Sequence, residues 1–444
     1  MTAFSMSKVG ILGLCLGSLA SLGYGSHFKD TVVVSPVAET TPIPQGLDST
    51  DDAEIWLHPT DAKRSLVLGV SKNKDNDDGS SGDGGLYVYD LNGKEIESFK
   101  VGRLNNVDIA YDVGLDKQSI DLAVASNRKN DSISLFSISD RRGITRIKSL
   151  PEIPLTDEPY GICTSKHPEN KRDALVFLPL KSGKVLIYHL KGYRNKFVSK
   201  ALPSIDLTKY TSATEQAFIK ELILKDVTHD YNSDPDEREE IDQEGGIEAV
   251  VAAEFEESGH QLEGCVVDQE NEVVYIGMER LGIWRVDLDE LDNEPSLAVR
   301  VTGSKVDGVP AGEFPFTDDV EGLSLYHRGK GKGYLIASMQ GISQFAFFDL
   351  EKMSESDGNE DSGYLGSLKI DDSRLFDKVT DSDGLAIMSA PLPHFPNGMM
   401  VVHDDQNTSS DGSTVNANYK YIDMRDVIQS FDGALKANRY WNPR

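Results

Sequence analysis

Short runs of apolar and β-branched residues recur along the chain, separated by turns rich in Gly, Asp and Asn. Each run has the length of a single strand, whereas strong helical periodicity is nearly absent. Many short strands at even spacing are typical of a sandwich, a barrel or a propeller. The clearest predicted strands are Ser65–Val70, Gly85–Leu91, Ile120–Ser126, Ser132–Ser137, Leu175–Pro179, Lys184–Leu190, Val273–Gly277, Gly282–Val286, Gly333–Ser338, Gln344–Leu350 and Met399–Val402.

A repeated unit decides between these three architectures. Each copy begins with an acidic or polar residue, usually followed by Gly and an apolar strand, and continues with two further strands. Repeats of this size, with about four strands in each, indicate propeller blades. The sequence therefore predicts an all-β, six-bladed β-propeller that forms a single domain over residues 26–444. The six copies begin near Asp52, Asn106, Tyr160, Glu263, Glu321 and Asp383.

Two insertions interrupt the repeats, near residues 73–84 and 210–260. The first is rich in Asp, Ser and Gly. Because it lacks the residue order of an EF-hand, a solvated loop is favoured over a Ca²⁺ site. In the second, Thr214–Lys225 is predicted to form a short helix, and the acidic segment Asp226–Gln243 is expected to be mobile. Both insertions are interpreted as surface decorations.

Residues 1–25 have the features of a secretory signal peptide. Lys8 supplies a positive charge, Val9–Leu22 is apolar, and small residues follow at Gly23 and Gly25. The apolar run is too short to span a bilayer comfortably, and no later stretch is long and apolar enough to do so. We therefore expect residues 1–25 to be removed and the protein to be secreted or periplasmic.

Two cysteines, Cys163 and Cys265, follow the signal segment. Each lies in a short apolar run, so a disulfide and two buried free thiols are both compatible with the sequence. Neither cysteine has a partner at CxxC spacing, which argues against zinc and thiol chemistry.

The chain is strongly acidic, with 45 Lys and Arg against 73 Asp and Glu and a formal net charge of −28. Such a charge repels nucleic acids and anionic membranes, so neither is expected as a partner. It favours cations, or a substrate that arrives with cations. The alternative is that the charge only keeps the protein soluble.

Acidic residues recur where the innermost strand of each predicted blade begins. These strands line the central channel, so their ends converge although they are far apart in sequence. Clustered carboxylates repel one another unless cations lie between them, and an oxygen-only ligand set favours Ca²⁺. The alternative is that each acid only caps a turn. The predicted ring contains Asp51, Asp52, Asp108, Glu263, Asp319, Glu321 and Asp383, with Glu279 at a neighbouring strand end.

Three cations, Lys72, Arg128 and Lys181, are expected at the same end of the channel, because each follows the second strand of its repeat. Surface ion pairs would explain each of them alone. Together with metal-holding carboxylates, however, they suit a polyanion, since Arg and Lys bind phosphate oxygens and metal ions neutralise the remaining charge. A phosphorylated substrate is the resulting prediction.

Several motifs of the sequence resemble those of a known family. The segment Asp51–Pro59, DDAEIWLHP, resembles the opening signature of the β-propeller phytases, which normally reads DDPAIWLHP. The resemblance extends from Glu39 to Val427 and is collinear. The other matching motifs are Tyr89–Gly93, Leu104–Ile109, Ala125–Arg128, Tyr160-Gly161, Leu262–Gly264, Asp319–Leu323, Gly331–Leu335, Ser338–Gly341 and Thr380–Gly384.

The resemblance implies a phosphoric monoester hydrolase of the 3-phytase type. Such an enzyme releases phosphate from myo-inositol hexakisphosphate (phytate), which it receives as the calcium complex. In that family several bound Ca²⁺ ions activate a water that attacks phosphorus in line, and no covalent phosphoenzyme forms. We expect the protein to be a monomer.

The same motifs imply roles for individual residues. The implied ligands of active-site calcium are Glu39, Asp51, Glu263, Glu279, Asp319, Glu321 and Asp383, while Asp52 and Asp377 resemble ligands of a nearby, tighter calcium. The implied substrate-binding residues are Lys72, Arg128, Tyr160, Lys181 and Gln340. The first four of these, with Glu263, are also the implied catalytic residues.

Two departures from the family pattern concern the expected site. Met278-Glu279-Arg280 replaces a more acidic run, and the acidic insertion before His260 has no counterpart in the family pattern. Two alternative functions remain open at this stage, a Ca²⁺-dependent propeller lactonase or esterase and a non-catalytic propeller that serves as a binding module. The cations expected at this end of the channel argue against the lactonase or esterase. The repeated carboxylates argue against the non-catalytic binding module.

Overall fold

The computed structural model describes residues 31–44, 49–73, 82, 84–288, 293–303, 305–306, 309–310, 316–354, 362–408, 412–438 and 440–444. The predicted signal peptide lies outside these ranges, as does most of the insertion near residues 73–84. Among the described residues, no helix combines the length and the apolar character that a membrane crossing requires.

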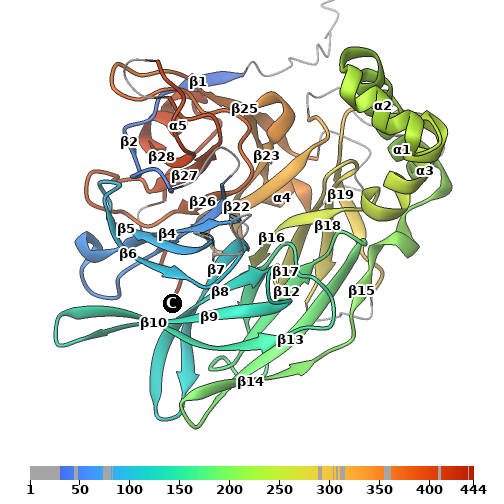
Figure 1. The fold of residues 1–444 in the computed structure, drawn as a ribbon. Helices are drawn as coiled ribbons and strands as arrows, with labels where there is room; N and C mark the ends of the chain where they lie inside the picture. Colours follow the sequence, from blue (N-terminus) through green and yellow to red (C-terminus); the bar gives the residue numbers. More distant parts are fainter. Residues whose placement is uncertain are drawn as a thin grey trace, which may run out of the picture.

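Six sheets of four or five strands surround a central axis within the described part of the chain, which confirms the six-bladed propeller (Figure 1). Every segment predicted as a strand falls on an observed strand. Blade one contains β3 (Thr50–Trp56), β4 (Leu66–Ser71), β5 (Gly85–Tyr89) and β6 (Glu95–Lys100). Blade two contains β7 (Leu104–Leu115), β8 (Gln118–Asn127), β9 (Ser132–Arg141) and β10 (Ile144–Pro154).

The next two blades follow the same antiparallel order from the axis outward. Blade three contains β11 (Cys163–Lys166), β12 (Ala174–Pro179), β13 (Lys184–Tyr193), β14 (Lys196–Ala201) and the short β15 (Ile205–Asp206). Blade four contains β16 (Leu262–Asp268), β17 (Val273–Met278), β18 (Gly282–Asp287) and β19 (Ser296–Arg300). A small hairpin, β20 (Lys305–Val306) and β21 (Val309–Pro310), follows blade four.

The last two blades take up strands from the beginning of the chain. Blade five contains β22 (Val320–Gly329), β23 (Lys332–Met339), β24 (Gln344–Asp349), β25 (Tyr364–Ile370) and β1 (Val32–Val34), which pairs parallel with β25. Blade six contains β26 (Leu385–Met388), β27 (Met399–Asp404), β28 (Asn418–Asp423) and β2 (Ala38–Glu39).

The ring is closed inside blade six. There β2 pairs antiparallel with β28, with Ala38 opposite Tyr421 and Glu39 opposite Lys420. Residues from near both ends of the propeller thus share one sheet, which Figure 1 shows as a blue strand beside red ones. This pairing fixes the first blade against the last.

Apolar faces of neighbouring blades pack against each other to form the core. Between blades one and two, for example, Trp56 and Leu68 contact a buried cluster that includes Val107 and Phe136. Each of these side chains is fully or almost fully buried. Burial of apolar surface is the main favourable term in folding, so these interfaces hold the ring together.

Glycines allow the innermost strands to approach one another closely. A Cβ atom on Gly161 would lie 1.9 Å from the carbonyl oxygen of Glu263, and one on Gly264 would lie 2.1 Å from that of Glu321. No side chain fits at these distances, so only glycine permits this contact. These glycines therefore let the residues before them, Tyr160 and Glu263, converge on the channel.

The second insertion is helical over most of its length, which corrects the prediction for it. It forms α1 (Ala213–Ser233), α2 (Pro235–Gln243) and α3 (Ile247–Ser258), whereas only Thr214–Lys225 was predicted to be helical and Asp226–Gln243 was expected to be mobile. The remaining helices are η1 (Ala62–Arg64), η2 (Leu207–Tyr210), η3 (Gln340–Ile342), α4 (Leu350–Met353) and α5 (Met424–Ser430).

Local signals explain why this acidic segment is ordered. Ser212 and Glu215 form a capping box at the start of α1, and Asp234 caps α2. Ile219, Ile223 and Val227 lie on one face of α1 and pack into the core of blades three and four. The acidic residues occupy the exposed faces, so the composition suggested disorder although the buried face anchors the segment.

Cys163 and Cys265 form a disulfide with a Cα–Cα distance of 5.6 Å. The two cysteines come from β11 and β16, the innermost strands of blades three and four. Of the two states compatible with the sequence, the structure has the disulfide. It joins the strand that follows Tyr160 to the strand that contains Glu263.

Candidate active site

Most acidic residues of the predicted ring meet at one end of the channel because the innermost strands begin there. Asp51 lies at the start of β3, Glu263 in β16 and Glu321 in β22. Asp383 lies just before β26, while Glu279 directly follows β17. We call this end of the channel the mouth.

Three glutamates form the centre of the mouth. One carboxylate oxygen from each of Glu263, Glu279 and Glu321 lies within 4.8 Å of the others. Glu263 and Glu321 are buried and Glu279 is half-buried. The side chain of Asn105 donates a 2.9 Å hydrogen bond to Glu263 Oε1. We refer to these three residues as the glutamate cluster.

Several oxygens at the mouth accept no hydrogen bond from any residue that the structure describes. They are Oε1 of Glu279, Oε2 of Glu321 and Oδ1 of Asp51, and all three are enclosed. A buried carboxylate oxygen without a donor is costly, since it has lost its water and gained no replacement. These oxygens are therefore available to a cation.

Burial and mutual repulsion act strongly on the same carboxyl groups. Burial is the main cause that raises the pKa of Glu279 to about 8, and repulsion from Glu263 adds to it. The same two causes raise the pKa of Glu321 well above its ordinary value. Burial likewise raises the pKa of Asp51, although Lys72 opposes this shift. Without a cation, Glu279 takes up a proton near neutral pH.

The donor set fits calcium. It consists of oxygens alone, from flexible carboxylates, and several of these oxygens lack a partner. Ca²⁺ takes six to eight oxygen ligands in loosely defined geometry, which such a cluster can supply. Glu263, Glu279 and Glu321 would hold the ion, with Asp51, Asp319 and Asp383 at the edge of the same site.

Asp319 is positioned by its backbone. Its φ angle of +68° is in the left-handed region, which an Asp tolerates better than most residues. The Asp319 amide donates a 2.9 Å hydrogen bond to the carbonyl oxygen of Glu279. Two predicted ligands from adjacent blades are therefore joined directly.

Lys72 and Gln340 contact carboxylates of the ring. Lys72 Nζ lies 2.9 Å from Asp383 Oδ2 and 3.2 Å from Asp51 Oδ2. The Gln340 side chain donates a hydrogen bond to Asp383 Oδ1. Both residues were predicted to bind substrate, and the structure places both at the mouth, where they hold Asp383.

Arg128, Tyr160 and Lys181 form a cationic wall beside the glutamate cluster. The Arg128 guanidinium lies 4.8 Å and the Lys181 ammonium 4.6 Å from the centre of the Tyr160 ring. Arg128 also donates to Asn105 Oδ1 at 3.1 Å, and Asn105 in turn holds Glu263. The predicted substrate-binding residues and the predicted metal ligands are thus linked by hydrogen bonds.

Arg103 is a cation at the mouth that the sequence reasoning missed. Burial is the main cause that lowers its pKa, and repulsion from Arg128 adds to it. Among the described residues, no carboxylate forms an ion pair with the Arg103 guanidinium, and its Nε atom is enclosed without an acceptor. Its position immediately before the motif Leu104–Ile109 was the available signal. Two adjacent guanidiniums favour an anion between them.

The sequence profile of the phytase family matches residues 2–195 and 233–444. The chain belongs to the β-propeller phytase family. It is 28% identical over 424 residues to the 3-phytase of Bacillus subtilis (strain 168), a match that covers 94% of this chain and 89% of that protein. This phytase is therefore a member of an enzyme family of phosphoric monoester hydrolases.

Solved structures with similar folds are more distant. An alpha-L-arabinofuranosidase from Fusarium graminearum matches with a TM-score of 0.44 and 8% identity, covering 88% of this phytase and 98% of that chain. Sqt1 from Chaetomium thermophilum matches with a TM-score of 0.38 and 13% identity, covering 86% and 89%. Neither likeness carries an argument about function.

Glu39, predicted as a ligand of active-site calcium, and Asp377, predicted as a ligand of a nearby, tighter calcium, both lie beside a lysine. Lys420 Nζ lies 2.5 Å from Glu39 Oε2, 3.2 Å from Asp404 Oδ2 and 2.9 Å from Asn407 Oδ1, and it also contacts Asp377. The Lys420 side chain is fully buried. We call Lys420 with Glu39, Asp377 and Asp404 the lysine cluster.

Asp52 and Asp108 were predicted to lie at the mouth. The structure places both deeper in the channel. The Val107 amide donates to Asp52 Oδ2 at 3.1 Å, and the Thr164 amide and hydroxyl donate to Asp108 Oδ2 at 2.6 and 3.0 Å. Both acids line a small internal cavity of about 40 Å³. Asp108 comes four residues after the start of its strand, which explains its depth.

The opposite end of the channel differs from the mouth in its chemistry. A cavity of about 300 Å³ lies there, lined by Asp108, Glu54 and the segment 441–444. Trp441 stacks on His327 at 4.4 Å, and Arg444 pairs with Asp121 at 2.8 Å. Residues 441–444 therefore form part of the wall at this end.

Proposed function

We propose that this phytase hydrolyses phosphomonoesters of phytate in a calcium-dependent reaction. The observation that carries the proposal is the glutamate cluster, in which one enclosed oxygen of Glu279 and one of Glu321 lack donors, next to the cationic wall of Arg128, Tyr160 and Lys181. When bound, calcium lowers the pKa of a nearby water and neutralises charge on the phosphoryl group. A substrate that is itself a calcium complex would bring further cations to this acidic mouth.

The cationic residues bind and orient the phosphate groups. Arg128 presents a planar guanidinium, which suits two phosphate oxygens at once, and Lys181 adds a point charge on the other side of Tyr160. Arg103 lies close to Arg128 and adds a second guanidinium. Together these residues hold a phosphate group beside the glutamate cluster.

Tyr160 provides a neutral hydrogen-bond donor. Burial raises its pKa far above the ordinary value, so the hydroxyl stays protonated. The Gln261 side chain donates to the Tyr160 oxygen at 3.1 Å, which leaves the hydroxyl proton for a phosphate oxygen. Its ring also supports both neighbouring cations through cation–π contacts.

We also propose that the protein is exported. The N-terminal segment 1–25 has the composition of a signal peptide, and the Cys163–Cys265 disulfide suits an oxidising compartment. Fractionation of expressing cells, with N-terminal sequencing of the mature protein, tests this proposal. Intact residues 1–25 on the active protein would contradict it.

The decisive experiment measures phosphate release from phytate while the free Ca²⁺ concentration is varied. We expect activity to rise with Ca²⁺, to disappear in excess chelator, and to return when Ca²⁺ is restored. Glucose 6-phosphate, which carries one phosphate, serves as the comparison substrate. Absence of phosphate release from phytate at every Ca²⁺ concentration would refute the proposal.

A further inference from the structure

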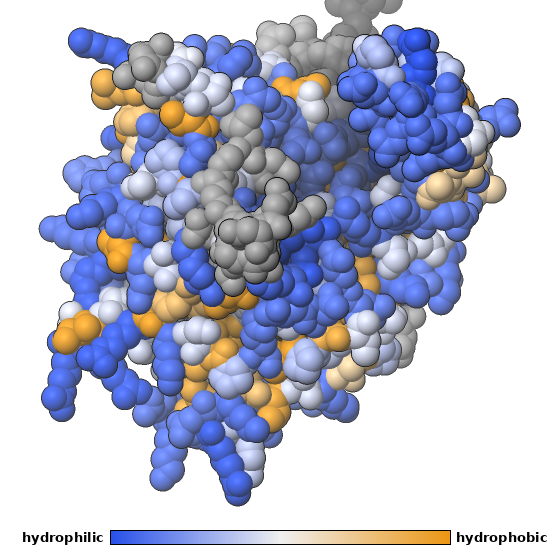
Figure 2. Space-filling view, in the orientation of Figure 1, coloured by the Kyte–Doolittle hydropathy of each residue, from blue (hydrophilic) through white to orange (hydrophobic). Residues whose placement is uncertain are grey.

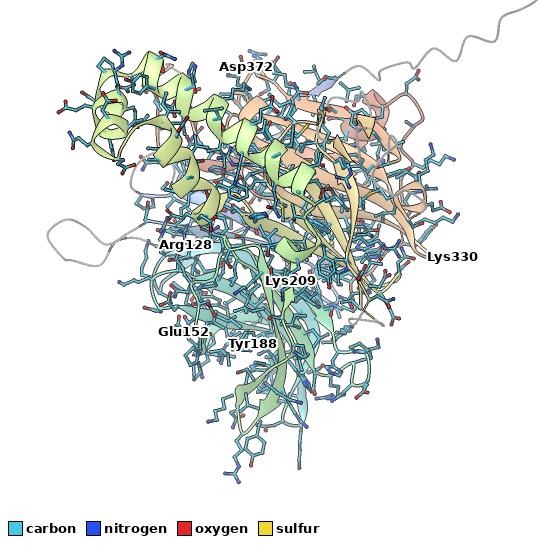
Figure 3. All side chains as sticks on the ribbon, turned by 90° about the vertical axis from the view of Figure 1, so that its right-hand side faces the viewer. Arg128, Glu152, Tyr188, Lys209, Lys330 and Asp372 are labelled. Atoms are coloured by element: carbon cyan, nitrogen blue, oxygen red, sulfur yellow. A yellow bond between two sulfur atoms is a disulfide. The ribbon has the colours of Figure 1, made fainter. Side chains whose placement is uncertain are left out.

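The helical insertion α1–α3 lies on the same face of the propeller as the mouth. The chain leaves the outer strand β15 of blade three and returns at Gln261 to the innermost strand of blade four, directly before Glu263. In Figure 3, the helices and Arg128 lie toward the left, whereas Lys330, in a turn at the other face, lies to the right. Figure 2 shows that the exposed face of this insertion is almost entirely hydrophilic.

Both ends of the insertion are fixed to the loop that carries Lys181. The Leu207 amide donates a 3.0 Å hydrogen bond to the carbonyl oxygen of Gly183. A Cβ atom on Gly183 would lie 2.6 Å from Thr208 and 2.9 Å from His260, so these residues pack directly on this glycine. The apolar face of α1 adds its burial against blades three and four. The insertion is therefore a fixed part of the mouth.

Arg280 connects the insertion to the glutamate cluster. It follows Glu279 in the turn between β17 and β18. Its Nη1 atom lies 2.9 Å from Asp226 Oδ2 on α1, and its Nη2 atom lies 2.7 Å from Glu254 Oε1 on α3. The side chain is 21% exposed, so these pairs are partly screened from water. Two helices of the insertion thus bind the two terminal nitrogens of one guanidinium.

The backbone connects Arg280 to two predicted calcium ligands. Arg280 is the neighbour of Glu279 in sequence, and Glu279 is joined by its backbone to Asp319. Burial is the main cause that raises the pKa of Asp319, Asp318 adds to it, and Arg280 opposes it. A guanidinium is always charged and pairs with carboxylates through two parallel hydrogen bonds.

We infer that the helical insertion holds Arg280 away from Glu279 and Asp319, so that these carboxylates stay available to calcium. Arg280 is then a positioning residue, because it acts through Glu279 and Asp319. The inference rests on the calcium site of the proposed function. It explains why a cation follows Glu279 without occupying the place of the metal. Asp226 and Glu254 supply the competing carboxylates that keep the guanidinium outside.

The test releases Arg280 by removing both of its partners. In the double variant Asp226→Asn, Glu254→Gln, the guanidinium is free to pair with Glu279 and Asp319 and competes with the metal. We expect the Ca²⁺ concentration at half-saturation to rise about fivefold or more, the lower range for coupled sites. Ca²⁺ binding is measured by isothermal titration calorimetry and by the Ca²⁺-induced shift in Tm, independently of hydrolysis.

Adding Arg280→Gln to the double variant removes the competitor. We expect this triple variant to regain wild-type Ca²⁺ affinity, a rescue that a damaged insertion or a lost calcium ligand would not produce. Arg285→Gln is the matched control, because Arg285 lies on the same blade and pairs with Asp287 at 2.8 Å. It should leave Ca²⁺ affinity unchanged. Should the double variant fail to fold, Asp226→Asn alone, at a half-exposed site, takes its place in the series.

Two results would overturn the inference: unchanged Ca²⁺ affinity in the double variant, or a loss that Arg280→Gln does not restore. Neither result affects the proposed function if the wild-type protein binds Ca²⁺ and hydrolyses phytate. Conversely, a wild-type protein that binds no Ca²⁺ would refute the proposed function itself. The calorimetric and kinetic measurements therefore separate the two failures.

Discussion

The glutamate cluster and the lysine cluster each bring three carboxylates together, yet only one of them contains its own cation. Around Lys420, the ammonium contacts Glu39, Asp377 and Asp404, and its side chain is fully buried. Burial works to lower the pKa of Lys420, but the carboxylates outweigh it and raise the pKa. Within the glutamate cluster, the described residues supply no ammonium or guanidinium, and enclosed oxygens lack donors.

This difference separates a structural role from a functional one. The lysine cluster receives an ammonium of its own when the chain folds, and it fixes Glu39 on β2 to Lys420 on β28, where the ring closes. The glutamate cluster remains electrostatically unfavourable until a cation arrives. The repulsion among its carboxylates makes the glutamate cluster a binding site. A metal ion, and a substrate that arrives with one, can relieve that repulsion.

The largest expected effect comes from removing one charge of the glutamate cluster. Glu263→Gln keeps the shape of the side chain but weakens the metal site, so we expect kcat/KM for phytate to fall about a thousandfold, as for loss of a central charge-stabilising group. Steady-state kinetics at saturating Ca²⁺ measures this. Glu270→Gln, outside the mouth, serves as the control. Full activity of Glu263→Gln would show that the cluster is not the catalytic site.

The next effect concerns stability and comes from the lysine cluster. Lys420→Met leaves three carboxylates without their cation, which we expect to cost about 3–5 kcal/mol of unfolding free energy, as for a broken buried ion pair. Urea unfolding in chelator at pH 8 measures this. Lys369→Met, which breaks an exposed pair with Asp371, should cost less than about 1 kcal/mol. Equal losses in the two variants would contradict the comparison.

The pH dependence of the metal-free protein tests the glutamate cluster in another way. Burial raises the pKa of Glu279 from 4.5 to about 8, so the folded state binds a proton that the unfolded state has already released. The stability due to this proton is therefore present below pH 4.5 and is lost as the pH rises toward 8. We expect the Tm measured in chelator to fall as the pH rises over this range. Added Ca²⁺ should raise the Tm most at the alkaline end of the range. Glu279→Gln should flatten the change in chelator, and an unchanged slope would contradict this assignment.

A smaller effect is expected on the substrate side of the mouth. Arg103→Gln removes one of two adjacent guanidiniums, so we expect KM for phytate to rise about tenfold with little change in kcat, as for loss of one charged hydrogen bond. Arg103→Lys, which keeps the charge, should restore part of this loss. An unchanged KM in Arg103→Gln would remove Arg103 from the phosphate site.

The sequence predicted the propeller well because its repeats carry their own signals. Each acidic-Gly pair marks an inner strand, and the glycine is required where backbones touch, as at Gly264. Convergence of Glu263 and Glu321 followed from that repeat, and Glu279 was predicted at a neighbouring strand end. The glutamate cluster could therefore be predicted without any contact information.

Other features depend on tertiary contacts that no local pattern contains. Glu39 and Asp377 carry the family's ligand signature, but only the fold shows that Lys420 lies between them. The disulfide required β11 and β16 to be neighbours. Helix α2 has few apolar residues, so its order depends on capping by Asp234 and on the burial of Ile241. Arg103 was missed because its importance comes from Arg128 beside it, which is distant in sequence.

The pairing of β2 with β28 also has a consequence for how the molecule is made. Glu39 and Lys420 are 381 positions apart, so the last seam of the ring cannot form until nearly the whole chain has been synthesised. Contacts between such remote segments form late and slow folding, because a long loop must first be closed. During synthesis, the strands at the future seam therefore stay unpaired while the later blades are still being made. Until β2 pairs with β28, the nascent chain depends on protection from aggregation.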